Sequence, residues 1–230
     1  MDPKAFRVAA TVLMLRDDPF EVLMVRRHAA ATFASRLVFP GGVLEPDDSD
    51  ESWLSLVTGA EGLDPQERAL RICAIRETWE ETSILLGADA APLPGGTFRD
   101  TVAAAGIRLP LERLTPFGHW ITPEAEPRRF DTHFYLAFAP HGQTAVADGG
   151  ETVELEWRSP AAETDGSVMF PTLMNLLRLA ESQDARSAIE HAALREPFTV
   201  QPVLVWRDDG SAVITIPAEA GYSATEFVHV

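Results

Sequence analysis

Three glutamates on one side of a short helical segment constrain this chain more than any other feature. They lie in Arg76-Glu77-Thr78-Trp79-Glu80-Glu81. An α-helix turns by about 100° per residue, so the three carboxylates lie within an arc of about 100° around the helix axis. Apolar residues occupy the opposite side, which we expect to be buried. Like charges four residues apart destabilise a helix unless something neutralises them. Carboxylates converging from one face suit Mg²⁺ or Mn²⁺, although a solvated acidic face is the simpler alternative.

A glycine pair follows an apolar stretch upstream, in Val38-Phe39-Pro40-Gly41-Gly42. Two glycines after a strand let a ligand approach the main chain closely, although an ordinary turn has the same composition. Together with the glutamates, the pair resembles the Nudix box, G-x5-E-x7-R-E-U-x-E-E-x-G-U, in which U is a bulky apolar residue. The residues that match its opening and its second half, in order, are Gly42, Arg76, Glu77, Glu80, Glu81 and Ile84.

The sequence departs from this motif in three ways. Gly42 and Arg76 are separated by 33 residues, so the box is interrupted by roughly 20 residues. Asp48 occupies the position of the first box glutamate as a shorter carboxylate, and its role is open. Thr78 and Ser83 replace an apolar residue and the box glycine, which affects packing and the turn after the helix more than the metal ligands.

The interruption itself is informative, because it resembles a subgroup that contains coenzyme A diphosphatases. Residues 39–44 and 69–78, on either side of the insert, carry this likeness. The segments 120–123, 127–132 and 201–202 extend it, so that it spans about residues 6–222. The resemblance implies an α+β fold, the Nudix α/β/α sandwich with a mixed β-sheet. It also implies metal-dependent hydrolysis of a nucleoside diphosphate linked to another moiety, with coenzyme A or acyl-coenzyme A as the leading substrate.

Two other functions stay open at this point. One is an ADP-ribose or NADH diphosphatase, and the other is a non-catalytic Nudix-fold module for binding or regulation. The intact set of Arg76, Glu77, Glu80 and Glu81 favours an enzyme, because a module released from catalysis need not keep it.

Composition limits the chain's organisation and partners. With 230 residues and 46% hydrophobic content it can bury a sizeable core. We expect one domain over 1–230, with an insertion at about 46–64 and a helix and hairpin extension from about 170. No apolar run reaches the length of a membrane span. Because the start of the chain leads straight into an expected strand, we expect no signal peptide, and the single Cys73 fits a reducing compartment, so we expect a cytoplasmic protein.

The net charge of −16 argues against a nucleic-acid polymer as partner, since such binding rests on basic residues meeting phosphates. An acidic protein also repels an anionic small-molecule nucleotide substrate, and divalent ions resolve this by bridging both sets of negative charge. The sequence indicates no membrane partner, and it leaves open whether the protein forms a homodimer.

Hydrophobic periodicity predicts the secondary structure. Strands are expected over 6–15, 21–26, 114–121, 130–138, 153–157 and a closing hairpin over 199–216. Helices are expected near 51–58, over 170–181 and over 185–194. The box helix should begin at Asp64 as N-cap with Pro65 following, and end near Leu86 with Gly87 as its C-cap.

The resemblance also implies roles for the box residues. Glu77 and Glu81 are the strongest metal ligands, Glu80 comes next, and the carbonyl of Gly41 or Gly42 completes the shell. Arg76 lies four residues before Glu80, so its guanidinium can hold that carboxylate. The general base is open between Glu77 and a distant glutamate. Glu151, at a glycine-rich strand entrance, is the better distant candidate, whereas Glu154 fits an edge strand equally well.

Substrate contacts are expected from a basic and aromatic segment. Arg128 and Arg129 are adjacent positive charges that suit a phosphate clamp, although they can instead neutralise nearby acids. Trp120 and Phe130 flank them as stacking partners. Arg26, and with it Arg27, is a further candidate.

Other features are interpreted more plainly. The histidines at 28, 119, 133 and 141 share no metal-ligand spacing, so most are expected to be structural or exposed. Cys73 is expected to be a small core thiol. The acidic insert between Pro46 and Asp64 is expected to pack beside the mouth of the active site and to influence substrate choice.

Overall fold

A mixed sheet forms the centre of the protein. The computed structural model describes residues 6–28, 36–88, 97–124, 126–163, 168–207, 209 and 211–229. The strands of the main sheet are β1 (Arg7–Arg16), β2 (Glu21–Arg27), β3 (Leu37–Val38), β4 (Gly41–Val43), β7 (Thr115–Ile121), β8 (Phe130–Phe138), β9 (Thr152–Arg158) and β10 (Thr199–Val200). Within the described residues the order is β10–β7–β8–β1–β2–β3, with β4 also paired to β1 and β9 to β2. The pairs β1/β8 and β7/β10 are parallel and the others antiparallel.

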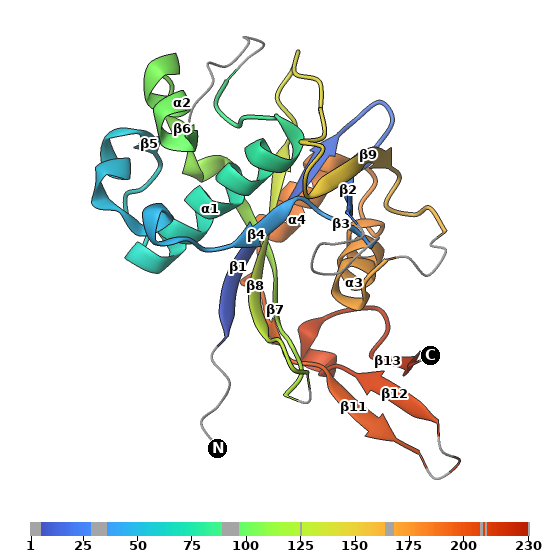
Figure 1. Ribbon diagram of the computed structural model, residues 1–230. Coiled ribbons are helices and arrows are strands. Elements are labelled where there is room, and N and C mark those ends of the chain that lie inside the picture. Colours follow the sequence, from blue (N-terminus) through green and yellow to red (C-terminus); the bar gives the residue numbers. More distant parts are fainter. Residues whose placement is uncertain are drawn as a thin grey trace.

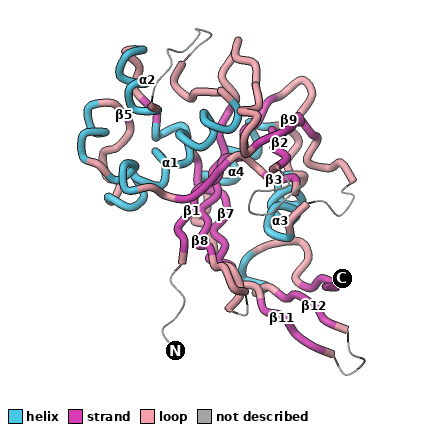
Figure 2. Tube along the Cα trace, viewed as in Figure 1, coloured by secondary structure: helices cyan, strands magenta, loops and turns pink. Residues whose placement is uncertain are grey.

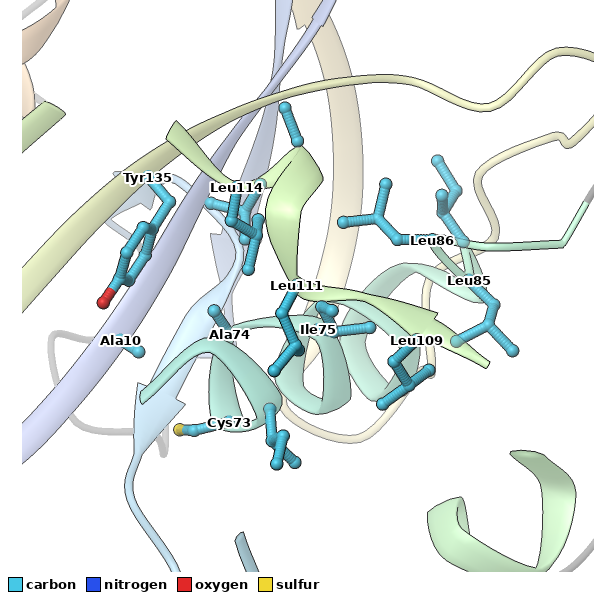
Figure 3. Packing of buried hydrophobic residues seen from close by; sticks show 14 of the residues in the cluster. Ala10, Cys73, Ala74, Ile75, Leu85, Leu86, Leu109, Leu111, Leu114 and Tyr135 are labelled. Carbon is cyan, nitrogen blue, oxygen red and sulfur yellow. The ribbon is translucent and has the colours of Figure 1, made fainter. Parts of the chain in front are cut away.

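Helices cover both faces of this sheet, as Figure 1 shows. They are α1 (Pro65–Thr82), α2 (Phe98–Ala105), α3 (Phe170–Leu179) and α4 (Ala185–Ala193). Alternation along β1 explains the two layers. Val12 and Met14 join the cluster under α1, part of which Figure 3 shows, whereas Leu13 and Leu15 join the cluster with α3 and α4. The expected α/β/α sandwich with a mixed sheet is confirmed.

Helix α1 begins as the sequence predicts and ends earlier. The Asp64 carboxylate accepts the N–H groups of the second and third helical residues, and Pro65 follows as the first. The helix stops at Thr82, because Ser83 adopts a left-handed conformation with φ 59°. Ser83 occupies the position of the box glycine, which supplies this conformation at lower cost. The expected end at Leu86 was wrong for this reason.

The insert folds against α1 and α2. It contains the 3₁₀ turns η1 (Pro46–Ser49) and η2 (Glu51–Ser55) and a short strand, β5 (Val57–Thr58), which pairs in parallel with β6 (Leu109–Pro110). Trp53 is fully buried and packs on Phe98 of α2, with ring centroids 5.5 Å apart. None of residues 46–64, all of which are described, lines the cleft that holds the box glutamates. The insert nevertheless reaches the cleft residues from behind, because its Asp48 contacts Arg76 and Glu45, which line the cleft. Its expected influence on substrate choice stays a prediction.

The C-terminal part forms a second, smaller sheet, which extends away from the main one (Figure 2). Its strands are β11 (Val203–Trp206), β12 (Ala212–Thr215) and β13 (Glu226–His229), and the 3₁₀ turn η4 (Ala218–Ala220) lies between β12 and β13. A further 3₁₀ turn, η3 (Leu111–Arg113), follows β6. The hairpin β11–β12 confirms the expected closing hairpin. Its first residues, 199–200, differ from the expectation because they pair with β7 in the main sheet. In the described ranges, no helix has the length and apolar character needed to cross a membrane.

Candidate active site

Arg76 is held rigidly by the main chain and by Asp48. Only 5% of the residue is exposed. Nε donates to Asp48 Oδ1 and Nη2 to Asp48 Oδ2, both at 2.9 Å, and Nη2 also donates to the Val43 carbonyl at 3.1 Å. Asp48 is fully buried and accepts the Glu45 N–H at 2.8 Å. The role of Asp48, which the sequence leaves open, is therefore that of a buried two-point partner for Arg76.

Arg76 in turn positions two of the box glutamates. Nη1 donates to Glu77 Oε1 at 2.9 Å and to Glu80 Oε2 at 2.8 Å. The main chain also approaches Glu77 closely, because a Cβ atom on Gly42 would lie 2.4 Å from the Glu77 carboxyl carbon. A side chain at this position would displace the carboxylate, which explains why glycine is needed there. The chain Asp48–Arg76–Glu77/Glu80 thus fixes both carboxylates from behind.

Glu81 lies deeper than the other two glutamates. Only 3% of the residue is exposed, and its Oε2 accepts the Gly41 N–H at 3.0 Å. Its Oε1 lies 3.4 Å from Arg27 Nη1 and has no hydrogen-bond donor. A buried carboxylate oxygen without a donor is energetically costly. Together with the neighbouring carboxylates, this orphaned acceptor fits a site for a hard cation.

Burial sets the protonation of these carboxyl groups. It raises the pKa of Glu81 to about 8 and that of Glu77 to about 7, and it also raises the pKa of Glu80. The neighbouring arginines oppose this shift without cancelling it. The thiol pKa of the buried Cys73 is also raised by burial, so at neutral pH it is an uncharged core thiol. The side chains of the site supply too little positive charge for all three glutamates to ionise at neutral pH.

The three glutamates form ion pairs with two different arginines. Glu77 and Glu80 contact Arg76, whereas Glu81 contacts Arg27. The carboxylate oxygens of these three described residues do not all lie within 4.8 Å of one another. Binding a cation here requires the carboxylates to exchange arginine contacts for metal contacts. Glu81 gives up the fewest hydrogen bonds in this exchange, because its Oε1 has none.

A large cleft opens in front of these carboxylates. Its volume is about 1240 Å³, above the range of about 300–1,000 Å³ that is typical of small-molecule sites. Charged groups and the glycine pair line it together with many aromatic and aliphatic side chains. The apolar lining comprises Val38, Phe39, Trp120, Phe130, Phe134, Val168, Met169, Phe170, Leu173, Ile214 and Phe227. The cleft thus combines the box glutamates with a large apolar lining.

The two adjacent arginines of the basic segment have different surroundings. Arg128 lines the cleft. Arg129 is buried, donates from Nε to the Thr122 carbonyl at 3.2 Å, and lies over the Phe6 ring at 4.2 Å. Of the two arginines expected to form a phosphate clamp, Arg128 therefore lies at the cleft, whereas Arg129 supports the connection between β7 and β8.

The two aromatic residues named with them both line the cleft. Trp120 is 2% exposed, and its Nε1 donates to the Tyr222 hydroxyl at 3.0 Å, which in turn donates to Asn175 Oδ1 at 3.2 Å. This chain fixes the indole against α3. Phe130 is half-buried, and the Arg7 guanidinium lies 5.9 Å from its ring centroid.

The carboxylates and arginines at the end of β2 also separate into two groups. Arg27 lines the cleft and lies 2.8 Å from Glu151, which lines it too. Arg26 instead contacts Glu154 at 2.7 Å, outside the cleft lining. Alternation along a strand places neighbours on opposite faces. Sequence reasoning named both arginines as candidates, and the strand geometry that separates them was not available from the sequence.

Two further cationic residues of the cleft were missed by sequence reasoning. Arg7 begins β1 and Arg36 precedes β3, and both line the cleft. No motif surrounds either residue, so their position depends on which strand ends meet at this edge of the sheet.

The geometry above agrees with a comparison of the chain with known families. The model of the NUDIX domain matches residues 5–171, which is most of the chain. The chain belongs to the Nudix family. Its fold, its glutamate helix and its glycine pair therefore identify it as a Nudix hydrolase, and Nudix hydrolases generally use divalent metal ions.

Relatives and solved structures support the same assignment. An acyl-coenzyme A diphosphatase of Xenopus laevis is 24% identical, over 88% of this chain and 71% of the relative. An acyl-coenzyme A diphosphatase of Gallus gallus is 28% identical, over 70% of this chain and 63% of the relative. The crystal structure of a NUDIX hydrolase from Alicyclobacillus acidocaldarius is 28% identical, with a TM-score of 0.68, and covers 81% of this chain and 96% of that one.

Proposed function

We propose that this Nudix hydrolase cleaves the diphosphate of coenzyme A or of an acyl-coenzyme A. One observation carries the proposal: a single cleft is lined both by the box glutamates and by many apolar side chains. An acyl-coenzyme A combines the matching groups, with a diphosphate beside the nucleotide and a long pantetheine and acyl arm. ADP-ribose and NADH carry polar groups on both sides of the diphosphate, and these groups would not make apolar contacts with such a lining. The two acyl-coenzyme A diphosphatases named above support this choice at low identity.

Mg²⁺ or Mn²⁺ is the cofactor that the donor set fits. Glu77, Glu80 and Glu81, with the carbonyl of Gly41 or Gly42, would hold it, because hard cations prefer oxygen ligands. When bound, the ion neutralises the charge of the diphosphate and lowers the pKa of a water molecule.

The protein's own groups position the reactants. Arg76, locked by Asp48, keeps Glu77 and Glu80 in place from the buried side. We assign Glu77 as the local candidate to accept the proton of the attacking water, since it lines the cleft among the box glutamates. Glu151 is the distant rival, because it lines the cleft beside Arg27.

Substrate recognition is proposed to divide along the cleft. Arg27 and Arg128 offer charge-assisted hydrogen bonds to phosphate oxygens. Phe130, which is half-buried, offers its ring to the adenine base, and Trp120, which is 2% exposed, completes the cleft lining. Arg129 is proposed to support this wall from beneath, given its bond to the Thr122 carbonyl. The apolar residues beyond them would take the pantetheine and acyl arm.

A turnover screen tests this assignment. Coenzyme A, an acyl-coenzyme A, ADP-ribose and NADH are each incubated with the protein and Mg²⁺ or Mn²⁺, and their products are separated by chromatography. We expect the highest kcat/KM for the acyl-coenzyme A. A preference for ADP-ribose or NADH would overturn the substrate assignment, and no turnover with any substrate would favour a binding module. The expected cytoplasmic location, single domain and oligomeric state remain predictions.

A further inference from the structure

A second group of metal-ligating side chains lies on the opposite face of the sheet from the cleft. On β7 and β8, Trp120, Thr132 and Phe134 line the cleft. The residues that alternate with them, His119, Asp131 and His133, therefore point to the other face. His119 pairs with His133 across the two antiparallel strands, which brings the two imidazoles side by side.

The three side chains converge on one carboxylate oxygen. His119 Nε2 lies 2.5 Å and His133 Nε2 lies 3.5 Å from the same atom, Asp131 Oδ1. One ligand atom from each residue lies within 4.8 Å of the other two. The side chains are 20%, 22% and 22% exposed, so the strands hold them firmly while an ion can still reach them from solvent. Two nitrogen donors and one carboxylate oxygen make a compact ligand set.

A neighbouring strand orients the first histidine. Thr199 of β10 pairs with His119 in parallel register, and its Oγ1 lies 2.7 Å from His119 Nδ1. A hydrogen bond at Nδ1 fixes the ring and leaves Nε2 to face Asp131. Metal-binding histidines typically make such a bond with the ring nitrogen that does not touch the metal. The cluster therefore has an outer hydrogen bond of the kind found around metal sites.

We propose that His119, Asp131 and His133 bind a divalent transition-metal ion such as Zn²⁺, at a site separate from the box glutamates. Imidazole nitrogens suit Zn²⁺, whereas Mg²⁺ prefers oxygen ligands, so the two sites have different ion preferences. Three protein ligands leave a coordination position for water. The rings stack with centroids 4.1 Å apart and planes inclined by 21°, so binding both nitrogens to one ion requires one ring to turn about its broad χ2 torsion.

The consequence of binding is a cross-link of the sheet edge. His119 lies on β7, the other two ligands on β8, and Thr199 ties β10 to the same point. These strands carry Trp120 and Thr132 of the cleft wall on their other face. Bound Zn²⁺ is therefore expected to stabilise the fold, without entering the reaction.

Equilibrium dialysis of the full chain against micromolar Zn²⁺ tests the proposal, with millimolar Mg²⁺ present to compete at the glutamates. We expect one high-affinity equivalent in the wild type and in Glu81→Gln, and its loss in His133→Ala and in Asp131→Asn. His141→Ala is the matched control, because this exposed histidine lies in a loop, and it should bind as the wild type does. Zn²⁺ at about 100 times its Kd should raise the wild-type Tm by about 5–10 °C.

Co²⁺ in place of Zn²⁺ gives a second readout that does not depend on enzyme activity. A visible absorption band typical of nitrogen ligation is expected for the wild type and should be absent in His133→Ala. Circular dichroism of each metal-free variant confirms that it is folded. Equal Zn²⁺ binding by the wild type and His133→Ala, or no stoichiometric binding by the folded wild type, would overturn the proposal and leave the cluster with a structural role, as a hydrogen bond between His119 and Asp131.

Discussion

Replacing Glu81 by glutamine separates the ligand role of this residue from its role in the fold. Burial raises the Glu81 pKa from 4.5 to about 8. Because the folded state then binds more protons than the unfolded state, stability falls as pH rises from about 4.5 to about 8. At pH 8 the buried charge costs roughly 4 kcal/mol by proton linkage, as an upper value.

The glutamine variant keeps the shape and removes this cost. Its amide oxygen can still accept the Gly41 N–H that now bonds Oε2, and Arg27 keeps its contact with Glu151 at 2.8 Å. Without metal, we expect Glu81→Gln to be about 1–4 kcal/mol more stable than the wild type at pH 8 and about equal at pH 5. Each kcal/mol corresponds to a Tm difference of about 2–4 °C.

Catalysis should respond in the opposite direction. With saturating Mg²⁺, we expect turnover by Glu81→Gln to fall about 10²–10³-fold, the scale for loss of one electrostatic contact to the transition state. Thermal unfolding between pH 5 and pH 8 in a chelator, with turnover measured on the same samples, checks both effects. Glu154→Gln is the control, because that exposed carboxylate pairs with Arg26 outside the cleft lining. Wild-type turnover, or lower metal-free stability than the wild type at pH 8, would refute the reasoning.

Other variants test the supporting groups. Asp48→Asn leaves Arg76 buried with a weakened partner and should cost about 3–5 kcal/mol in chemical denaturation and lower kcat more than it raises KM; unchanged stability would exclude the buried ion pair. Arg128→Ala should raise the KM for coenzyme A about ten- to a hundredfold, and more than for its 3′-dephospho form; equal losses on both would exclude a 3′-phosphate contact. Arg129→Ala should mainly lower Tm, by about 2–8 °C, and an unchanged Tm with a raised KM would return it to the substrate site. Leu173→Gln should raise the KM for a long acyl-coenzyme A about tenfold and leave that for coenzyme A unchanged; no difference between the two substrates would exclude an acyl channel.

Local signals predicted much of the fold. Asp64 and Pro65 mark the start of α1 because capping depends on neighbouring residues, and alternation predicted β1, β2, β7, β8 and β9 within a residue or two. The end of α1 was missed because Ser83 adopts the left-handed conformation usually supplied by glycine. A serine at this position does not by itself predict a left-handed backbone conformation.

The candidate site was predictable where the family motif is contiguous and not where contacts are distant. The helix pattern gave the link between Arg76 and Glu80, which are one turn apart. The partner on the other side, Asp48, lies across an insert, so only the folded chain shows that it meets Arg76. The cluster of His119 and His133 depends in the same way on the β7–β8 register, which spacing along the sequence does not encode.

The central claim is that the box glutamates support metal-dependent cleavage of a diphosphate in an acyl-coenzyme A. Its most direct test is mass spectrometry of the products formed from an acyl-coenzyme A and Mg²⁺ in ¹⁸O-labelled water, with wild type and Glu81→Gln compared. Hydrolysis of the diphosphate should yield adenosine 3′,5′-bisphosphate and the acyl-phosphopantetheine, with the label in one of the new phosphate groups, for the wild type alone. Equal yields from both proteins, or cleavage only at the thioester, would contradict the account.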